Sequence, residues 1–221
     1  MIETLSLLRL MTWLSPAFPV GAFAYSHGIE QAIHAGLIRD RDTLEDWLCD
    51  LLLRGSGWND AVFFAESHRK SGRGETGLAA LSELAEALAG TRERHMETML
   101  QGEAFLAAAG AWPHPALAFL PRRIAHPVAV GAVCGAHGIA IEAALPAYLH
   151  GFISNLVQGA VRLVPLGQRD GVALLCAMEE PIMHCSRIAA SSCLDDLGSP
   201  AILSDIMAMR HETQYSRVFR S

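Results

Sequence analysis

Lysine is almost absent from this chain of 221 residues. Of the 17 basic residues, 16 are arginine, and Lys70 is the one lysine. With 23 acidic residues the formal net charge is −6, so the chain lacks the clustered positive charge that a broad nucleic-acid surface needs. We therefore expect no nucleic-acid partner. The arginines either dock carboxylates of a protein partner or reflect a preference for arginine codons, and the sequence leaves both explanations open.

Residues that favour strands are also scarce. Val, Ile and Thr together number 29, whereas Ala alone numbers 34 and Leu 29. Ala and Leu keep most of their side-chain freedom in a helix, and β-branched residues lose it. No segment shows the repeated alternation of apolar and polar residues that successive strands require. The composition predicts an all-α protein, a single-domain multi-helix bundle that spans residues 1–221.

Motifs for nucleotide or hydrolytic chemistry are missing. The patterns G-x-x-x-x-G-K-[ST], G-x-S-x-G, H-E-x-x-H and C-x-x-C do not occur in the sequence. Residues 72–77 do match G-x-G-x-x-G, but charged residues with a helical pattern precede them, where a dinucleotide site requires a strand. We interpret residues 71–77 as an exposed loop.

Neither a disulfide framework nor a membrane anchor is indicated. The five cysteines are odd in number and scattered, which is typical of free thiols in a reducing compartment. The N-terminal residues include Glu3 and Arg9, where a signal peptide has basic residues and then an unbroken apolar run. The longest uncharged apolar stretch, residues 127–141, is too short to span a bilayer comfortably. We expect a cytoplasmic protein with no membrane partner.

Histidine and cysteine form pairs, but no set of three or four ligands. Structural zinc sites assemble that number from short spacings. Each pair is either ordinary packing and solvation or a weak transit site for nickel or zinc, both of which accept imidazole and thiolate ligands. We predict no resident cofactor and no resident metal. The pairs are Glu30 with His34, Cys134 with His137, and His184 with Cys185.

Hydrophobic periodicity and helix-end signals predict a chain of helices. The first should end before Pro16, because the residue before a proline is pushed out of the α region. Asp42-Thr43-Leu44-Glu45 has the spacing of a capping box and should open another helix. The predicted helices cover residues 5–14, 24–35, 42–53, 58–69, 78–89, 91–109, 128–141, 146–164, 168–178, 186–194 and 201–215.

The two ends of the chain have unusual compositions. Residues 16–30 mix prolines, glycines and aromatics without a clean periodicity, and the last twelve residues carry three arginines and two aromatics. Tyrosine and arginine are enriched at binding hot spots because they combine a large contact area with polar tips. Each end either docks a partner or packs its aromatics against the body, and the residues alone do not decide.

Five blocks of the sequence, in order along the chain, resemble the UreF family of urease accessory proteins. The first and last blocks are the most specific, and the match covers nearly the whole chain except for residues 71–77. The blocks are SPAFPVGAFAYSHGIE (15–30), TRERHMETMLQGEAFL (91–106), HPVAVGAVCGAHGI (126–139), LPAYLHGFISNLVQGAVRLVPLGQ (145–168) and HETQYSRVFRS (211–221).

The resemblance implies an all-α protein that forms a homodimer and has no enzymatic activity of its own. UreF-like proteins bind UreD, which is also called UreH, and then recruit the nickel-carrying GTPase UreG. The assembly delivers nickel to apo-urease, and the UreF-like protein regulates GTP hydrolysis or couples it to metal transfer. The alternative is a nickel-binding metallochaperone that carries the metal itself.

The resemblance also implies which residues bind partners. In the family the C-terminal tail orders against UreD, and an aromatic residue of the N-terminal loop helps a tail arginine to form the UreG-binding surface. Residues 210–221 are the corresponding docking tail here, and Phe23 and Tyr25 are both candidates for the aromatic role. The partner-binding positions implied by the motif match are Pro19, Gly21, Phe23, Tyr25, Glu30, Tyr215, Arg217, Phe219 and Arg220.

Overall fold

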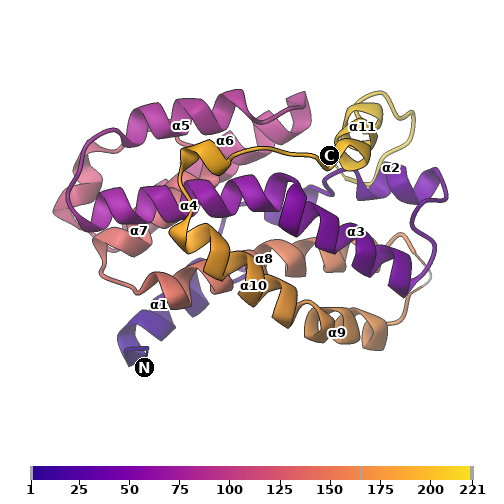
Figure 1. Ribbon diagram of the computed structural model, residues 1–221, viewed down its shortest axis with the longest axis horizontal. Coiled ribbons are helices and arrows are strands. Elements are labelled where there is room, and N and C mark those ends of the chain that lie inside the picture. The colour runs from indigo at the N-terminus through magenta and orange to yellow at the C-terminus, as the bar shows by residue number, and fades with distance from the viewer. Residues whose placement is uncertain (1, 165, 220–221) are drawn as a thin grey trace.

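The computed structural model describes residues 2–164 and 166–219, and within these residues the chain forms helices and connections with no strand (Figure 1). The helices pack into one compact body, so the predicted all-α, single-domain bundle is confirmed. In the part of the chain that the structure describes, three short 3-10 turns connect some of the helices. The α-helices in the described residues are α1 (Thr4–Trp13), α2 (Ile29–His34), α3 (Arg41–Arg54), α4 (Ser56–Gly72), α5 (Leu78–Ala87), α6 (Arg92–Ala109), α7 (His126–Ala136), α8 (Ile141–Ala160), α9 (Gln168–Ala177), α10 (Glu179–Ser191) and α11 (Ile202–His211).

Helices α4, α7 and α8 form the centre of the bundle, and the other helices pack around them (Figure 1). Nearly every residue of α7 is buried, which is why its sequence shows no polar face. Gly131 on α7 lets the backbones of α7 and α4 approach closely, because a Cβ there would collide with the carbonyl of Phe64 and the hydroxyl of Ser67. This close crossing holds the scaffold on which the outer helices lie.

Helix α3 begins earlier than the sequence predicted. The cap is Asp40, whose carboxylate accepts the Thr43 backbone N–H at 2.9 Å, while the Thr43 hydroxyl reaches back to the Asp40 backbone N–H. The predicted capping box at Asp42 is therefore wrong by two residues. Asp40 precedes Thr43 by three residues, and Asp42 precedes Glu45 by three residues. The spacing alone therefore did not distinguish the two possible starts of the helix.

Two helices that contain a proline begin earlier than the sequence predicted. Helix α8 begins at Ile141 and runs through Pro146, and α10 begins at Glu179 with Pro181 in its first turn. A proline in the first turn loses no helical hydrogen bond, and Pro146 loses one that the burial of α8 offsets. His184, which precedes the predicted helix of residues 186–194, thus lies within α10.

The segment before α2 is irregular, although a helix was predicted from residue 24. His27 has φ +50° and Gly28 has φ +76°, so two successive residues adopt the left-handed conformation and only Ile29–His34 is helical. Helix α4 extends to Gly72 and buries Ser71, so the exposed connection covers residues 73–77. None of the helices in the described residues is long and apolar enough to cross a membrane.

Candidate functional site

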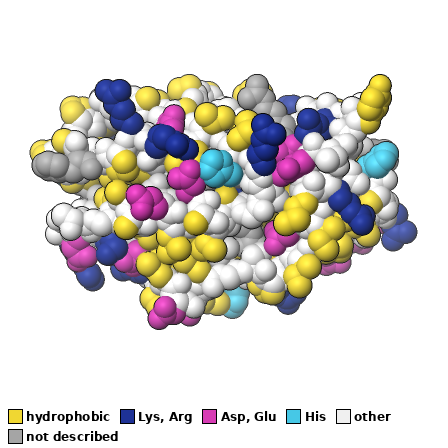
Figure 2. All heavy atoms as spheres, turned by 90° about the horizontal axis from the view of Figure 1, so that it is seen from above, with side chains coloured by type: hydrophobic (Ala, Val, Ile, Leu, Met, Phe, Trp, Pro, Cys, Tyr) yellow, Lys and Arg dark blue, Asp and Glu magenta, His cyan; other side chains and the backbone are white. Residues whose placement is uncertain are grey.

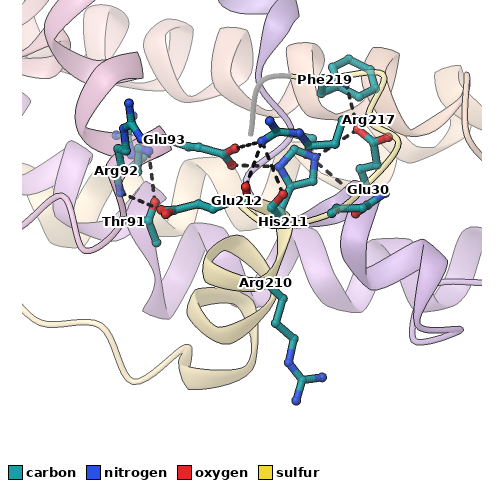
Figure 3. A network of polar contacts seen from close by, with 12 residues as sticks. Glu30, Thr91, Arg92, Glu93, Arg210, His211, Glu212, Arg217 and Phe219 are labelled. Atoms are coloured by element: carbon teal, nitrogen blue, oxygen red, sulfur yellow. Dashed lines mark hydrogen bonds and ion pairs between the residues drawn. The ribbon is translucent and has the colours of Figure 1, made fainter.

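The two unusual ends of the sequence meet on one side of the bundle. We call residues 15–28 the N-terminal loop and residues 212–219 the tail segment. The tail segment follows α11, which packs against α2, and it runs back over the start of α6 toward α8 (Figures 1 and 3). Gly28 makes the packing of α2 on α11 close, since a Cβ there would be 2.7 Å from the backbone nitrogen of Ala208.

Glu30 holds the tail segment by its backbone. This side chain is only 6% exposed, and its carboxylate oxygens accept the backbone N–H groups of Val218 at 2.7 Å and Phe219 at 2.8 Å. Hydrogen bonds to a buried charged acceptor are short and strong. The contact does not depend on the side chains at 218 and 219, so Glu30 fixes the path of the tail segment.

His211, the last residue of α11, links Glu30 to a second carboxylate. Its side chain is fully buried, with Nε2 at 3.2 Å from an oxygen of Glu30 and Nδ1 at 2.8 Å from an oxygen of Glu93 (Figure 3). A neutral imidazole has one donor, whereas an imidazolium has two. When both carboxylates are ionised, the ring donates to both only in its doubly protonated, positively charged form.

Glu93 also binds the tail segment through Arg217. The guanidinium of Arg217 lies 2.6 Å from the other oxygen of Glu93, and it is 38% exposed. The neighbouring Glu212 accepts the backbone N–H of Arg92 at 2.8 Å, at the N-terminus of α6, where a negative charge is favourable. We call Glu30, Glu93, His211 and Arg217 the tail network.

The end of the described tail segment packs on α8. The ring of Phe219 is buried and lies over Gly159 of α8, where an added Cβ would be 3.4 Å from the Phe219 Cζ. Arg210, in contrast, points away from the tail network (Figure 3). The tail segment is thus held by the buried ring of Phe219, by the hydrogen bonds of its backbone to Glu30 and by the ion pair of Arg217 with Glu93.

A second set of buried charges lies next to the tail network, on the first two turns of α6. Arg94 forms two hydrogen bonds with the carboxylate of Asp60 at 2.6 and 2.7 Å and a third with Glu97 at 3.1 Å. The ring of His27, from the N-terminal loop, lies 3.0 Å from Glu97, and the hydroxyl of Tyr148 lies 3.3 Å from Asp60. We call these five residues the core network.

The charges of the core network stabilise one another. Burial raises the pKa of Glu97, but the nearby His27 and Arg94 outweigh burial and bring it to about 2. Burial lowers the pKa of Arg94, but Asp60 and Glu97 outweigh it and raise that pKa above its ordinary value. The carboxylate of Glu97 and the guanidinium of Arg94 are therefore both charged at neutral pH.

Two small cavities flank the core network, with volumes of about 80 and 90 Å³. The N-terminal loop covers the first cavity with Phe23 and Tyr25. His126 also faces that cavity, and burial, with Arg94 close by, lowers its pKa to about 4, so its ring is neutral at pH 7. The residues that line both cavities include His27, Asp60, Arg94 and Glu97.

The residues implied as partner-binding divide into exposed and buried groups. Pro19, Phe23, Tyr215 and Arg217 are exposed, with Phe23 at 67% and Tyr215 fully exposed, and Gly21 is half-buried. Tyr25, Glu30 and Phe219 are buried in the chain itself and position the segments that carry the exposed residues. Arg220 lies outside the described residues.

Glu93 and His211 are the two residues of the tail network that the sequence did not single out. Both lie in blocks that resemble the UreF family. From the sequence alone, however, a single glutamate on a helix is interpreted as a solvent-exposed charge, and a single histidine as a residue of ordinary packing. They are 118 positions apart, so no local spacing connects them. Only the packing of α11 beside α6 brings them together.

The metal-ligand pairs do not converge in the structure. Cys134 is buried, which raises the pKa of its thiol to about 12, and the two ring nitrogens of His137 face Arg9 and the Trp112 carbonyl. His184 is exposed whereas Cys185 is buried, and Glu30 binds the tail segment while His34 is exposed. No group of three or more His, Cys, Asp or Glu side chains suited to a metal occurs in the described part of the chain.

The surface seen from above, past α5, α6 and α11, mixes charges of both signs (Figure 2). Lys and Arg side chains alternate there with Asp and Glu, and hydrophobic side chains are scattered between them. On this face the charges form no continuous area of one sign, so recognition there depends on individual side chains more than on a broad electrostatic field.

Comparison with known proteins gives a consistent result along the whole chain. The UreF family model matches residues 38–179. The chain is 56% identical over 219 residues to the urease accessory protein UreF of Mesorhizobium japonicum, an alignment that covers 99% of this chain and 98% of that protein. It is 55% identical over 219 residues, with the same coverage, to the protein of that name from Rhizobium johnstonii. Urease accessory protein UreF 1 of Brucella suis biovar 1 is 56% identical over 218 residues, covering 99% of this chain and 95% of that protein.

Proposed function

Because the chain belongs to the UreF family of urease accessory proteins, we propose that it is a non-enzymatic scaffold that binds UreD and then recruits the GTPase UreG. In this role it couples GTP hydrolysis to nickel insertion into apo-urease in the cytoplasm. The docked tail segment is the single observation that carries the proposal. It brings the tail residues implied as partner-binding onto the same body as the N-terminal loop.

The mechanism is positional. Buried charges fix the backbone of the tail segment and the end of the N-terminal loop, while Phe23 and Tyr215 remain exposed for a partner. Holding exposed side chains on an ordered backbone lowers the entropy cost of binding. A bias of about 1–3 kcal/mol between two conformations of a bound GTPase, which is typical of coupling between sites, is sufficient to link hydrolysis to metal release.

The test is a capture experiment with the full-length chain, UreD and UreG, added together and separately. We expect UreG to be captured only when UreD is present. Phe23→Ala and Tyr215→Ala should each reduce capture of UreG or UreD at least about tenfold, as loss of an exposed aromatic anchor does. Val172→Ala, at an exposed apolar position on α9, is the matched control and should leave capture unchanged.

Deletion of residues 212–221 should abolish capture while the circular dichroism of the helices persists. Capture of both partners by the truncated chain at the original affinity would contradict the assigned role of the tail segment. The alternative of a nickel carrier is separated in the same experiment. Tight, stoichiometric nickel binding by the isolated chain, lost on changing Cys134 or His184, would support that alternative and not the scaffold.

We further propose that the chain forms a homodimer through α1. Leu5, Leu8 and Met11 on this helix are 50–65% exposed, and an open groove of about 340 Å³ runs between α1 and α8. Exposed apolar area of this kind is favourable to bury in an interface. Light scattering should give a dimer mass for the unchanged chain and a monomer mass for Met11→Arg. A monomer mass for the unchanged chain at micromolar concentration would contradict the proposal.

A further inference from the structure

His27, near the end of the N-terminal loop, has an unusual backbone conformation. In the part of the chain that the structure describes, it is the one residue other than glycine with a positive φ, +50°. An L-residue in this left-handed region crowds its own backbone, so the conformation persists only where other contacts determine it. We propose that His27 is the positioning residue of the N-terminal loop, and that its ring holds the loop in the conformation that presents Phe23 to a partner. The role in partner binding rests on the proposed function, whereas the placement of the loop does not.

Three helices hold the ring of His27. Its Nδ1 lies 3.0 Å from the Ser56 hydroxyl on α4, and its Nε2 lies 3.0 Å from a carboxylate oxygen of Glu97 on α6. Because an ionised carboxylate only accepts hydrogen bonds, Nε2 donates to Glu97. The ring also packs edge to face with Phe152 on α8, with the centroids 5.0 Å apart at an interplanar angle of 86°. The side chain of His27 is 4% exposed, so these contacts, rather than water, determine where the ring lies.

The start of the N-terminal loop is held by a different kind of contact. Phe18 is buried, and its ring packs on Phe105 and Trp112 with centroids 5.4 and 6.5 Å apart. The short turn that carries the exposed Phe23 lies between these two anchors. A segment fixed at both ends has fewer accessible conformations than a segment fixed at one end. Loss of the His27 contacts therefore loosens the end of the loop, while Phe18 keeps its start on the bundle.

A cavity of about 80 Å³ lies beneath this turn, and Phe23, Tyr25 and His27 are among the residues that line it. Side chains that face a cavity lack packing partners on that side, so dispersion contributes less to holding the turn. Phe23 itself is 67% exposed on its outer side. The placement of the turn thus depends on its anchors more than on the packing beneath it.

Hydrogen exchange of the full-length chain, followed by mass spectrometry, tests the placement of the loop without any partner. His27→Ala removes both hydrogen bonds of the ring but keeps a Cβ in the left-handed region. We expect the peptide of residues 19–28 to exchange at least about tenfold faster in this variant, the loss typical of a hydrogen bond to a charged group. Peptides of α4 and α7 should keep their protection, because the effect is local to the loop.

Further variants separate this role from a general effect on the fold. His27→Gln places an amide nitrogen near the position of Nε2 and still donates to Glu97, so it should restore most of the protection. His184→Ala, at an exposed position on α10, is the matched control and should exchange as the unchanged chain does. If His27→Ala does not fold, Ser56→Ala removes only the second hydrogen bond of the ring and should speed exchange of the same peptide about threefold.

Capture of UreG in the presence of UreD tests the consequence for partner binding. His27→Ala should reduce capture about as much as Phe23→Ala does, and His27→Gln should retain it. Faster exchange of the loop with unchanged capture would support its placement by His27 and contradict the partner role of the loop in the proposed function. Unchanged exchange of residues 19–28 in His27→Ala, or in Ser56→Ala where the first variant does not fold, would overturn the proposal.

Discussion

The core network and the tail network lie on the same face of α6 but differ in the source of their positive charge. In the core network Arg94 neutralises two carboxylates, Asp60 and Glu97. In the tail network the ring of His211 lies between two carboxylates, and the arginine present, Arg217, is 38% exposed and contacts only one of them. Arginine stays charged at every relevant pH, whereas histidine does not.

The two networks also differ in the parts of the molecule that they join. The core network joins α4, α6, α8 and the end of the N-terminal loop, all parts of the body of the bundle. The tail network joins the body to a segment without a helix of its own. The first contact is buried within the bundle, whereas the second reaches the solvent through the partly exposed side chain of Arg217.

The largest expected effect comes from removing the charge of the core network. Arg94→Met leaves two carboxylates buried without their cation, and we expect the free energy of unfolding to fall by about 3–5 kcal/mol. Urea denaturation measures the change. Arg41→Met is the matched control, because Arg41 pairs with Asp42 on the exposed surface and its loss should cost at most about 1 kcal/mol. Equal losses in the two variants would contradict the assignment of the core network.

The second effect is a pH dependence of the core network. The pKa of Glu97 is about 2 in the folded chain against an ordinary value of 4.5, so its stabilisation is present in full above about pH 4.5 and is lost as the pH falls toward 2. The difference in stability between the unchanged chain and Glu97→Gln should shrink by about 3 kcal/mol over that range. Urea denaturation at several pH values measures it. A difference that does not vary with pH would show that the charge of Glu97 contributes nothing.

The smallest effect on stability, and the most local, is expected in the tail network. Glu30→Gln keeps an acceptor oxygen but loses the charge that pairs with His211, so the free energy of unfolding should fall by about 1–2 kcal/mol. The exchange protection of the Val218 and Phe219 amides should be lost, while the amides of α4 and α7 keep theirs. Glu45→Gln, on the outer part of α3, is the control and should change neither quantity. Uniform loss of protection in every helix would mean that Glu30 belongs to the core rather than to a local contact.

The helical class and most of the helices were predictable from the sequence. Abundant Ala and Leu, scarce β-branched residues and the 3.6-residue period act locally, so the pattern of each helix is visible in its own residues. The errors came where packing overrides a local signal. Pro146 sits inside α8 because burial of that helix offsets one lost hydrogen bond, and His27 adopts a positive φ because Glu97 and Ser56 hold its ring.

By itself, the sequence determined the fold class, the resemblance to the UreF family and the unusual, aromatic-containing composition of the two ends of the chain. Only the tertiary structure decided that Glu30, Glu93 and His211 form one site, and that Tyr25 and Phe219 are buried in the chain. The physical reason is distance along the chain. Periodicity indicates which face of its own helix a side chain occupies. A buried ion pair can be recognised only when both of its partners are known, and the partners here come from separate helices.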